Sequence, residues 1–313
     1  MPHWTAPIRR STAEIFSIWW ELARIIAPVA ITVEFLMRTG VIAAIAPAFA
    51  PLMGFYGLPP ELALALLAGV LIGIWNAAVL LFLLVPMDYL SVADVTVFSA
   101  LILFVHALPI EQQIIRRTGT GMLASTLLRI AGGLIYAAIL RVLFDATGWL
   151  SQPVAPAWQP VADSSGWAGF LIGLAETLAM MFVILVALML LMALLQRLGI
   201  MALIHRLLTP LMRLVGIRGK AVNLTVIGLL LGISYGGGLL IREARSGQIA
   251  PRQVFLSCTF MGFAHSMIED TLVVMALGAD AFSVLAGRMV FAMIATALVA
   301  AVLTKLPERA PQS

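Results

Sequence analysis

The sequence predicts an all-α integral membrane protein built from two repeats of opposite orientation in the membrane. Three observations support this fold class. Hydrophobic residues make up 62% of the 313 residues and charged residues only 11%, and the mean hydropathy is +1.06, far from the balance of soluble domains. Rare residue types coincide when the chain is shifted along itself by 159 positions, the separation of His106 and His265. Arginines are also distributed differently in the two halves.

The shift of 159 positions superimposes residue types that rarely coincide by chance. The superimposed pairs include His106 with His265, Arg38 with Arg197, Arg129 with Arg288, and Pro51 with Pro210. The chain is therefore predicted to contain an N-terminal segment (1–13), repeat 1 (14–145), a linker (146–172), repeat 2 (173–304) and a C-terminal segment (305–313). Duplication in membrane proteins is typical of a substrate path between the two halves.

Both repeats are predicted to contain the same elements in the same order. A long apolar transmembrane helix (14–37; 173–196) precedes an amphipathic helix at the membrane interface (40–56; 199–218). A glycine-containing apolar segment follows (61–85; 220–241), and two further transmembrane helices complete the repeat (95–115 and 121–144; 253–279 and 281–304). Apolar runs long enough to cross a bilayer occur at about 14–37, 95–115, 121–144, 168–196 and 281–304.

The arginines predict that the repeats are inverted. Basic residues are frequent in the interfacial stretch of repeat 2 and in the loop after its glycine segment, whereas the matching stretches of repeat 1 hold a single arginine. The basic residues of repeat 2 are Arg197, His205, Arg206, Arg213, Arg218, Lys220, Arg242, Arg245 and Arg252, and the arginine of repeat 1 is Arg38. Because basic residues favour the cytoplasmic side, equivalent loops are expected on opposite sides of the membrane.

The glycine-containing segments are predicted to be re-entrant hairpins. If they crossed the membrane, the arginine-rich loop of repeat 2 would lie opposite the arginine-rich stretch before it. A hairpin removes this conflict, with turns expected at Asn76-Ala77-Ala78 and Tyr235-Gly236-Gly237-Gly238. Both termini are then expected in the cytoplasm, with the protein in the inner membrane of a bacterium. Two parallel repeats of four crossings each are the alternative, and they leave the arginine contrast unexplained.

The strongest candidate site residues are the two superimposed histidines and the acids that follow them. Glu269 stands four residues after His265, so the two are expected on one helix face, while Asp270 superimposes on Glu111 of repeat 1. Pro109 is expected to break the helix that carries His106. Because ionisable groups in a bilayer cost about 2.5–3.5 kcal/mol each, they mark pathways more often than packing. The alternative is that His106 and His265 only hydrogen-bond neighbouring helices.

The hairpin turns supply a second group of candidates. Free backbone groups and half-helix ends at such turns can bind an ion or a polar solute. The candidate residues are Asn76, Ser234, Tyr235, Gly236 and Gly237. The alternative is that the glycines only allow two helices to pack closely. For Arg129 and Arg288 we expect ion pairing or lipid headgroup contact at the membrane interface, with binding of a substrate anion as the second interpretation.

Several function classes are not supported by the sequence. It contains no phosphate-binding Gly-x-x-x-x-Gly-Lys-Ser/Thr loop and no His-Glu-x-x-His motif, so neither nucleotide-driven transport nor an intramembrane zinc protease is predicted. The single cysteine, Cys258, excludes an internal disulfide. No enzyme activity, cofactor or nucleic-acid partner is predicted; the expected partners are the lipid bilayer and a small-molecule or ion substrate, and a homo-oligomer is compatible with the sequence.

Two strings resemble the nucleoside recognition, or Gate, family of membrane domains. They are Gly232-Ile233-Ser234-Tyr235-Gly236-Gly237-Gly238 and, after an arginine-containing loop, Phe263-Ala264-His265-Ser266-Met267-Ile268-Glu269-Asp270. Similar domains occur in concentrative nucleoside transporters, in the permease part of the ferrous iron transport protein B and in the spore maturation A and B pair. Most of the chain resembles two fused Gate domains, which implies a transport core that contains hairpins.

These observations predict a secondary transporter or permease for a small solute, nucleoside-like or otherwise polar, coupled to protons or another cation. His106, Glu111, His265, Glu269 and Asp270 are expected to bind the substrate or the coupling ion. One alternative is a permease for divalent metal cations, with His265 and Glu269 as candidate ligands. Another is a membrane scaffold that transports nothing and acts through a partner protein.

Overall fold

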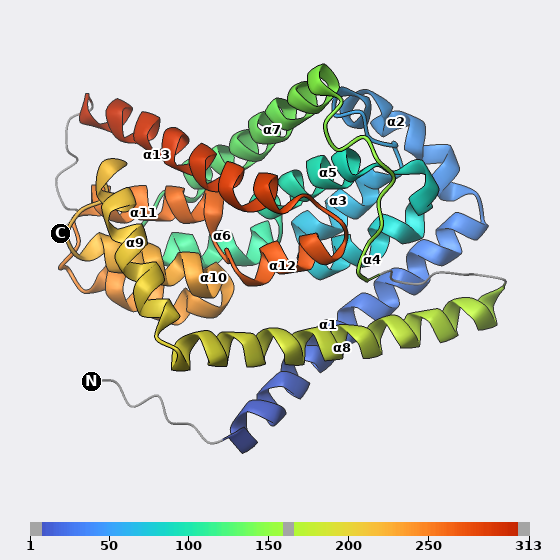
Figure 1. The fold of residues 1–313 in the computed structure, drawn as a ribbon, viewed down its shortest axis with the longest axis horizontal. Helices are drawn as coiled ribbons and strands as arrows, with labels where there is room; N and C mark the ends of the chain where they lie inside the picture. Colours follow the sequence, from blue (N-terminus) through green and yellow to red (C-terminus); the bar gives the residue numbers. More distant parts are fainter. Residues whose placement is uncertain (1–7, 159–165, 306–313) are drawn as a thin grey trace.

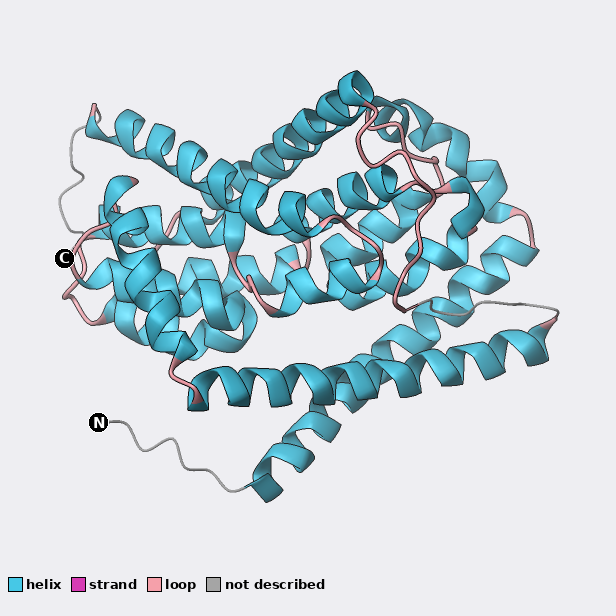
Figure 2. Ribbon diagram, in the orientation of Figure 1, coloured by secondary structure: helices cyan, strands magenta, loops and turns pink. Residues whose placement is uncertain are grey.

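The computed structural model describes residues 8–158 and 166–305, and within these ranges the secondary structure is helical (Figure 2). Strand-like pairing among the described residues is limited to one isolated bridge between Ser91 and Pro153. The prediction of an all-α membrane protein is confirmed. The N-terminal segment, the linker and the C-terminal segment lie partly outside the described residues.

The helices of the second half follow the order of those in the first half. The first half contains α1 (Ile8–Arg38), α2 (Val41–Phe55), α3 (Leu62–Leu71), α4 (Ile74–Leu84), the 3-10 turn η1 (Met87–Tyr89), α5 (Val92–Val105), α6 (Leu108–Arg117) and α7 (Met122–Thr147). The second half contains α8 (Trp167–Arg197), α9 (Ile200–Leu214), α10 (Lys220–Arg245), α11 (Pro251–Ala264), α12 (Glu269–Ala276), the π-helical turn η2 (Phe282–Gly287) and α13 (Arg288–Thr304). The first and last residues of α8, α9 and α11 stand 159 positions after the first and last residues of α1, α2 and α5, respectively.

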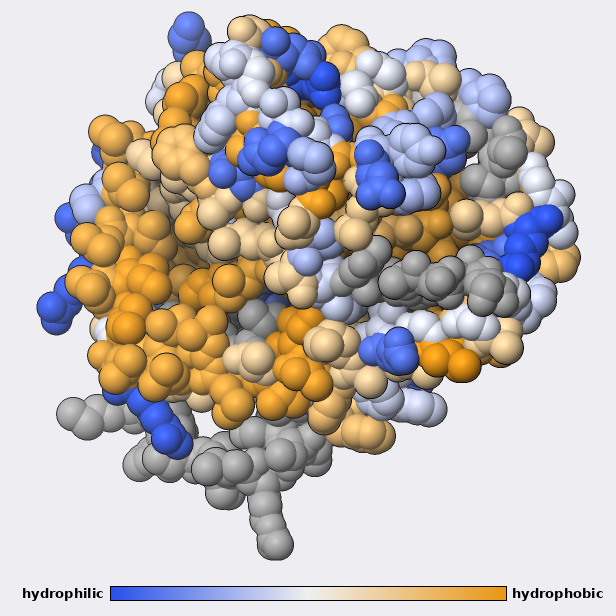
Figure 3. All heavy atoms as spheres, turned by 45° about the vertical axis from the view of Figure 1, so that its right-hand side comes forward, coloured by the Kyte–Doolittle hydropathy of each residue, from blue (hydrophilic) through white to orange (hydrophobic). Residues whose placement is uncertain are grey.

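Four stretches of helix are long and apolar enough to cross a membrane. They are Val92–Arg117, Met122–Thr147, Trp167–Leu195 and Phe282–Thr304. Each overlaps a transmembrane helix that the sequence predicts. Much of the molecular face in Figure 3 is hydrophobic, with hydrophilic residues mainly in its upper part and at its edges, as expected for a surface that contacts lipid. The inverted orientation of the repeats stays a prediction.

Both glycine-containing segments are interrupted at a glycine. Gly73 separates α3 from α4 with φ 149° and ψ 174°, and Gly232 interrupts α10 with φ 79° and ψ 167°. These two glycines superimpose under the 159-residue shift, and their φ values are ones that side chains disfavour. The turns expected at 76–78 and 235–238 are wrong, because the backbone of these residues is helical. The break therefore lies three residues before each expected turn.

The helices that carry the two histidines are also interrupted. In repeat 1, α5 ends at Val105, Ala107 has φ 48°, and α6 begins at Leu108 with Pro109 in its first turn. The predicted break near Pro109 is thus confirmed, at a place where proline leaves no helical hydrogen bond unmade. In repeat 2, α11 ends at Ala264 and α12 begins only at Glu269. The continuous helix expected over 253–279 is therefore wrong.

The two halves are interleaved around these breaks. In Figure 1, α1 and α8 lie along one side of the molecule, α7 and α13 lie on the opposite side, and most of the other helices lie between them. The short helix α6 of the first half packs against α10 of the second, and α12 packs against α4 and α5 of the first. The part of each interrupted helix that follows the break, α6 or α12, thus contacts the other half.

Candidate functional site

The candidate site is formed where the two interrupted helices meet. His106 and His265 stand directly after α5 and α11 in extended conformations. The interrupted apolar segments provide hydrogen-bond acceptors for the freed backbone groups: Ala107 N donates to Gly69 O at 3.0 Å, and Met267 N donates to Leu229 O at 2.9 Å. Because buried backbone groups must be paired, these contacts fix both breaks, and with them the histidines.

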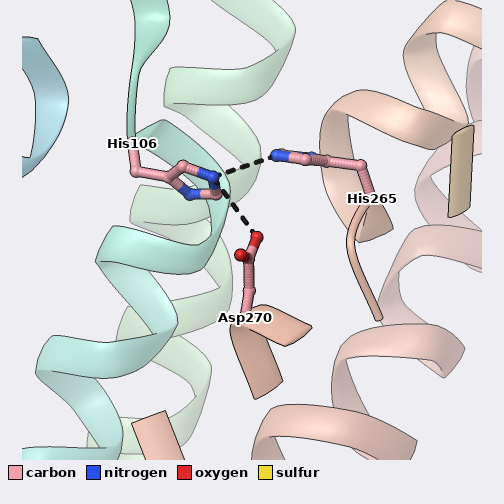
Figure 4. Close-up of side chains that lie close together, drawn as sticks. All are labelled: His106, His265 and Asp270. Atoms are coloured by element: carbon pink, nitrogen blue, oxygen red, sulfur yellow. Dashed lines mark hydrogen bonds and ion pairs between the residues drawn. The ribbon is translucent and has the colours of Figure 1, made fainter. Parts of the chain in front are cut away.

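The two histidines face each other across the centre of the molecule. Their Nε2 atoms are 3.2 Å apart, and both rings are almost completely buried. Figure 4 shows the rings pointing toward each other from opposite sides, with Asp270 directed at His106 from a third direction. The two histidines that are equivalent under the shift of 159 positions are therefore in direct contact in the structure.

Hydrogen bonds at the other ring nitrogens determine which nitrogens of the pair carry hydrogen. His106 Nδ1 lies 3.0 Å from Ile102 O, and His265 Nδ1 lies 2.9 Å from Met261 O. A carbonyl oxygen can only accept, so each Nδ1 must be the donor. In the neutral form of each imidazole, Nε2 is then a bare acceptor. Two acceptors consequently face each other at 3.2 Å.

Two buried carboxylates approach the same pair, and each comes from the opposite repeat. Asp270 Oδ2 lies 3.3 Å from His106 Nε2, and Glu111 Oε2 lies 3.2 Å from His265 Nε2. Both carboxylates are buried, at 5% and 2% exposed. Two imidazole nitrogens and two carboxylates therefore converge with their acceptor atoms inward. Burying facing acceptor atoms is costly unless they are paired. Arg129 pairs with Glu111, and a proton or a metal ion among the remaining acceptors would stabilise them.

Arg129 and Arg288 hold the broken helix ends that surround the cluster. Arg129 Nε donates to Phe104 O and Arg288 Nε donates to Phe263 O, both at 2.8 Å. A second nitrogen of each guanidinium donates to the carbonyl of the histidine in the same repeat, at 3.3 and 3.2 Å. Arg288 Nη2 also donates to Leu103 O of the other half at 2.9 Å. The backbone carbonyls that lose their helical hydrogen bonds at the breaks thus accept hydrogen bonds from charged guanidinium groups.

The lipid headgroup role expected for these arginines is wrong. Arg129 is 1% exposed and Arg288 is 2% exposed. The stem of Arg129 passes over Gly262, where a Cβ would lie 2.8 Å from Arg129 Cγ, so the side chain points into the protein rather than toward an interface. The expected ion pairing is confirmed for Arg129, whose Nη1 lies 2.7 Å from Glu111 Oε2. The guanidinium of Arg288 has no such partner, and its Nη1 makes no hydrogen bond within the described part of the chain.

Glu269 does not join the cluster. The break after His265 places Ser266 at φ 49° and moves Glu269 to the start of α12, so the shared helix face expected for His265 and Glu269 is wrong. Glu269 is half-buried and makes no hydrogen bond or ion pair among the described residues. Asp270, which the repeat correspondence matched to Glu111, is the acid that faces a histidine.

The structure describes the side chains of only some of the hairpin candidates. Asn76 is buried in α4, and its Oδ1 has no hydrogen-bond partner in the described residues. A Cβ on Gly237 would lie 3.0 Å from Ile114 Cδ1 of α6, which supports the close-packing interpretation for this glycine. Ser234, Tyr235 and Gly236 belong to a helical stretch, and their side chains lie outside the described part of the structure.

Two buried polar residues next to the acids were missed by the sequence interpretation. Gln112 follows Glu111, Thr271 follows Asp270, and both are 3% exposed. Neither side chain has a hydrogen-bond partner for its polar atoms within the described residues. The signal was present in the sequence, because Gln112 and Thr271 superimpose under the same shift of 159 positions. The roles of Arg129 and Arg288 could have been found from their correspondence in the same way.

Comparison with known proteins agrees with the resemblance seen in the sequence. The family model for Gate, described as nucleoside recognition, matches residues 178–281, which contain His265, Asp270 and the break at Gly232. The uncharacterized membrane protein YvoD of Bacillus subtilis (strain 168) is 27% identical over 294 residues, covering 91% of this chain and 91% of its own length. No solved structure matches the chain. The Gate assignment is confirmed for the second repeat, and the relative is likewise a membrane protein.

Proposed function

We propose that this membrane protein, whose second repeat carries a Gate domain, is a secondary transporter for a small polar solute. Its two repeats are inverted relative to each other in the cytoplasmic membrane of a bacterium, with both termini in the cytoplasm. The site of coupling is the group formed by His106, Glu111, His265 and Asp270, here called the central cluster. A cation bound there, and released during the cycle, drives movement of the solute.

The observation that carries this proposal is the pair of histidine Nε2 atoms 3.2 Å apart at the contact between the halves. Both Nδ1 atoms donate to backbone carbonyls, so a cation gained or lost at Nε2 changes the attraction between the two repeats directly. With a cation, the four side chains hold the broken helices together. Without it, facing acceptors repel, and the contact between the repeats is weakened. This is the bistable element that alternating access requires.

Three buried side chains offer unpartnered polar groups to a polar solute. Buried polar atoms are normally hydrogen-bonded to protein or water, yet the side chains of Asn76, Gln112 and Thr271 are buried and have polar atoms without a partner in the described residues. They lie on α4, α6 and α12, three of the helices near the two breaks. Water or a solute with several hydroxyl or amide groups would satisfy them, and nucleosides belong to this class.

The first test identifies a ligand and then measures its transport. The purified chain is melted in detergent against a panel of nucleosides, nucleobases, organic anions and divalent cations. A ligand at a hundred times its dissociation constant stabilises the folded state by about 2.7 kcal/mol. Any stabilising compound is then used, in radiolabelled form, for uptake into liposomes that contain the protein.

We expect uptake to depend on the central cluster. His106→Ala combined with His265→Ala should abolish uptake, whereas His205→Ala should not, because the ring of His205 lies on α9 and faces Asn223 at 3.1 Å instead. Undiminished uptake in the double variant would contradict the proposal. A panel without any stabilising compound, together with a protein partner that purifies with the chain, would favour the scaffold alternative.

A further inference from the structure

We infer that the central cluster is a binding site for one divalent cation of the first transition series, with His106 Nε2, His265 Nε2 and an Asp270 oxygen as ligands. This inference deepens the proposed function by naming the cation, but the binding of the ion can be measured without any transport. Three potential ligand atoms of these residues lie within 4.8 Å of one another, and all three residues are buried.

The spacing of the ligand atoms matches that of a metal centre. A tetrahedral ion with bonds of about 2.0–2.1 Å to nitrogen and oxygen holds its ligand atoms about 3.3–3.4 Å apart. The two Nε2 atoms are 3.2 Å apart, and Asp270 Oδ2 is 3.3 Å from His106 Nε2. The ligand atoms of His265 and Asp270 lie within 4.8 Å of each other, so the third pair is also close. Asp270 Oδ2 accepts no hydrogen bond from the described residues, so it is available as a ligand.

The hydrogen bonds around the histidines also match those of metal ligands. A histidine that binds a metal through one nitrogen usually donates the hydrogen on its other nitrogen to a carbonyl or carboxylate, which fixes the tautomer and the ring plane. His106 and His265 both have this arrangement, with Ile102 O and Met261 O as the acceptors. The free Nε2 atoms are thus oriented before any ion arrives. A pair of histidines that only linked two helices would need one Nε2 to be a donor instead.

The charges near the cluster moderate the affinity for a cation. Glu111 is paired with Arg129 at 2.7 Å, so these two charges largely cancel. Glu111 Oε2 also lies 3.2 Å from His265 Nε2, close enough to become a fourth ligand if its contact with Arg129 loosens. Arg288 is the remaining nearby positive charge and opposes tight binding. A transported or coupling ion must be released as well as bound, so a moderate affinity is suitable here.

The types of ligand atom select the class of cation. Imidazole nitrogens together with a carboxylate suit zinc, iron, cobalt, nickel and copper, whereas magnesium and calcium prefer sites made of oxygen atoms. Sodium and potassium are likewise bound mainly by oxygen. Two of the three ligand atoms in the central cluster are nitrogens. Among metal ions, the geometry therefore points to a divalent transition metal.

Co²⁺ is the most informative probe, because its visible absorption reports both binding and the geometry of its ligands. The full-length chain is purified in detergent, treated with a chelator and titrated with Co²⁺. We expect saturable binding of one ion per chain, with the absorption bands of a low-coordinate nitrogen and oxygen site, and displacement by Zn²⁺. Mg²⁺ added at the same concentration should displace nothing.

The variants test which residues hold the ion. Loss of a residue that only supports a metal ligand weakens binding by about 10–100-fold, so His265→Asn, His106→Asn and Asp270→Asn should each weaken Co²⁺ binding by at least that much. His205→Asn is the matched control and should bind as the unchanged protein does. Size-exclusion profiles of each variant show whether it remains folded, and Asp270→Asn, which keeps the shape of the side chain, provides a test if a histidine variant fails to fold.

Three results would overturn the inference: no saturable Co²⁺ binding, binding unchanged in His265→Asn and Asp270→Asn, or binding lost in His205→Asn. The failure of this inference can be distinguished from failure of the proposed function. Solute uptake that needs His106 and His265 without any metal binding identifies the coupling cation as a proton, which rejects the metal site and leaves the transporter in place. Metal binding without transport of any kind rejects the transporter and leaves the metal site.

Discussion

The two halves of the molecule place equivalent acids in different surroundings. In the first half, Glu111 extends to Arg129, with 2.7 Å between oxygen and nitrogen. In the second half, Asp270 occupies the equivalent position but is shorter by one methylene group, and it forms no ion pair with Arg288 among the described contacts. Its Oδ2 instead lies 3.3 Å from His106. One acid thus stabilises the framework, and the other remains available to a ligand.

The arginines themselves are used in the same way in both halves. Each donates through Nε to the carbonyl two residues before the histidine of its own repeat, and through Nη2 to the carbonyl of that histidine. These backbone contacts are therefore symmetric. The two sides differ in that Arg288 Nη2 also donates to Leu103 O, whereas Arg129 is paired with the longer acid, Glu111. This comparison teaches that small differences in side-chain length can divide structural and functional roles between duplicated residues.

The largest expected effect is the loss of stability on removing Arg129, the arginine that is ion-paired with an acid. Arg129→Met removes the arginine that is ion-paired with the buried Glu111, and breaking a comparable buried pair costs about 3–5 kcal/mol. Arg288→Met removes hydrogen bonds to three carbonyls but leaves no ion pair broken, so its effect should be smaller. The melting temperatures of the two variants in the same detergent measure this difference.

A second substitution tests the explanation. Arg129→Met combined with Glu111→Gln removes both members of the ion pair, and we expect it to recover part of the stability that Arg129→Met alone loses. If Arg288→Met were as destabilising as Arg129→Met, the carbonyl contacts rather than the ion pair would dominate, and the comparison between the halves would not hold for stability.

An intermediate effect is expected from changing the length of the acids. Glu111→Asp should pull the carboxylate away from Arg129 and cost about 1.5–3 kcal/mol, the usual contribution of a hydrogen bond between charged groups. Asp270→Glu should move the carboxylate toward Nη1 of Arg288. The net change in stability should be smaller, because the new contact between charges offsets the cost of fitting the added methylene into a packed site. Thermal melting gives the stabilities.

The same two variants also separate structure from binding. Asp270→Glu should weaken Co²⁺ binding because its carboxylate is drawn toward Arg288, whereas Glu111→Asp should affect binding less than stability. Equal losses of stability in both variants would show that side-chain length does not create the asymmetry.

The sequence could predict the residues that meet but not the way in which the backbone brings them together. The repeat correspondence identified His106 with His265 and Glu111 with Asp270, because a duplicated fold tends to place equivalent residues in equivalent positions. It did not reveal the break after His265, since no proline follows that histidine as Pro109 follows His106. The choice of Glu269 as the partner of His265 failed for this reason, because it assumed a continuous helix.

The interrupted apolar segments show a related limit. The strings around Asn76 and Gly236 have the composition of a turn, but the breaks lie at Gly73 and Gly232. The composition of these strings indicates that the helix can break nearby. The exact position of the break depends on which residue can adopt the backbone angles that the tertiary contacts require. The depth of Arg129 and Arg288 was also missed, because the freed carbonyls that bind them exist only once the helices are known to break.

The smallest expected effect concerns a position at which the two halves differ by one methyl group. Gly237 of the second half corresponds to Ala78 of the first, which is completely buried. In the second half a Cβ would lie 3.0 Å from Ile114 Cδ1 and 3.2 Å from Cγ2, because α6 packs closely against α10. Gly237→Ala should therefore cost about 1 kcal/mol, at the low end of the range for overpacked sites, since alanine also favours the helix.

Ile114→Ala removes the side-chain atoms that the new methyl group would meet. In that background Gly237→Ala should be neutral or stabilising, so a double-mutant cycle of melting temperatures should show coupling between the two positions. An equal loss in both backgrounds would mean that the close approach of α6 to α10 does not require this glycine. Since α6 also carries Glu111, a strong coupling would show that the glycine of the second half determines how near the acid of the first half lies to the central cluster.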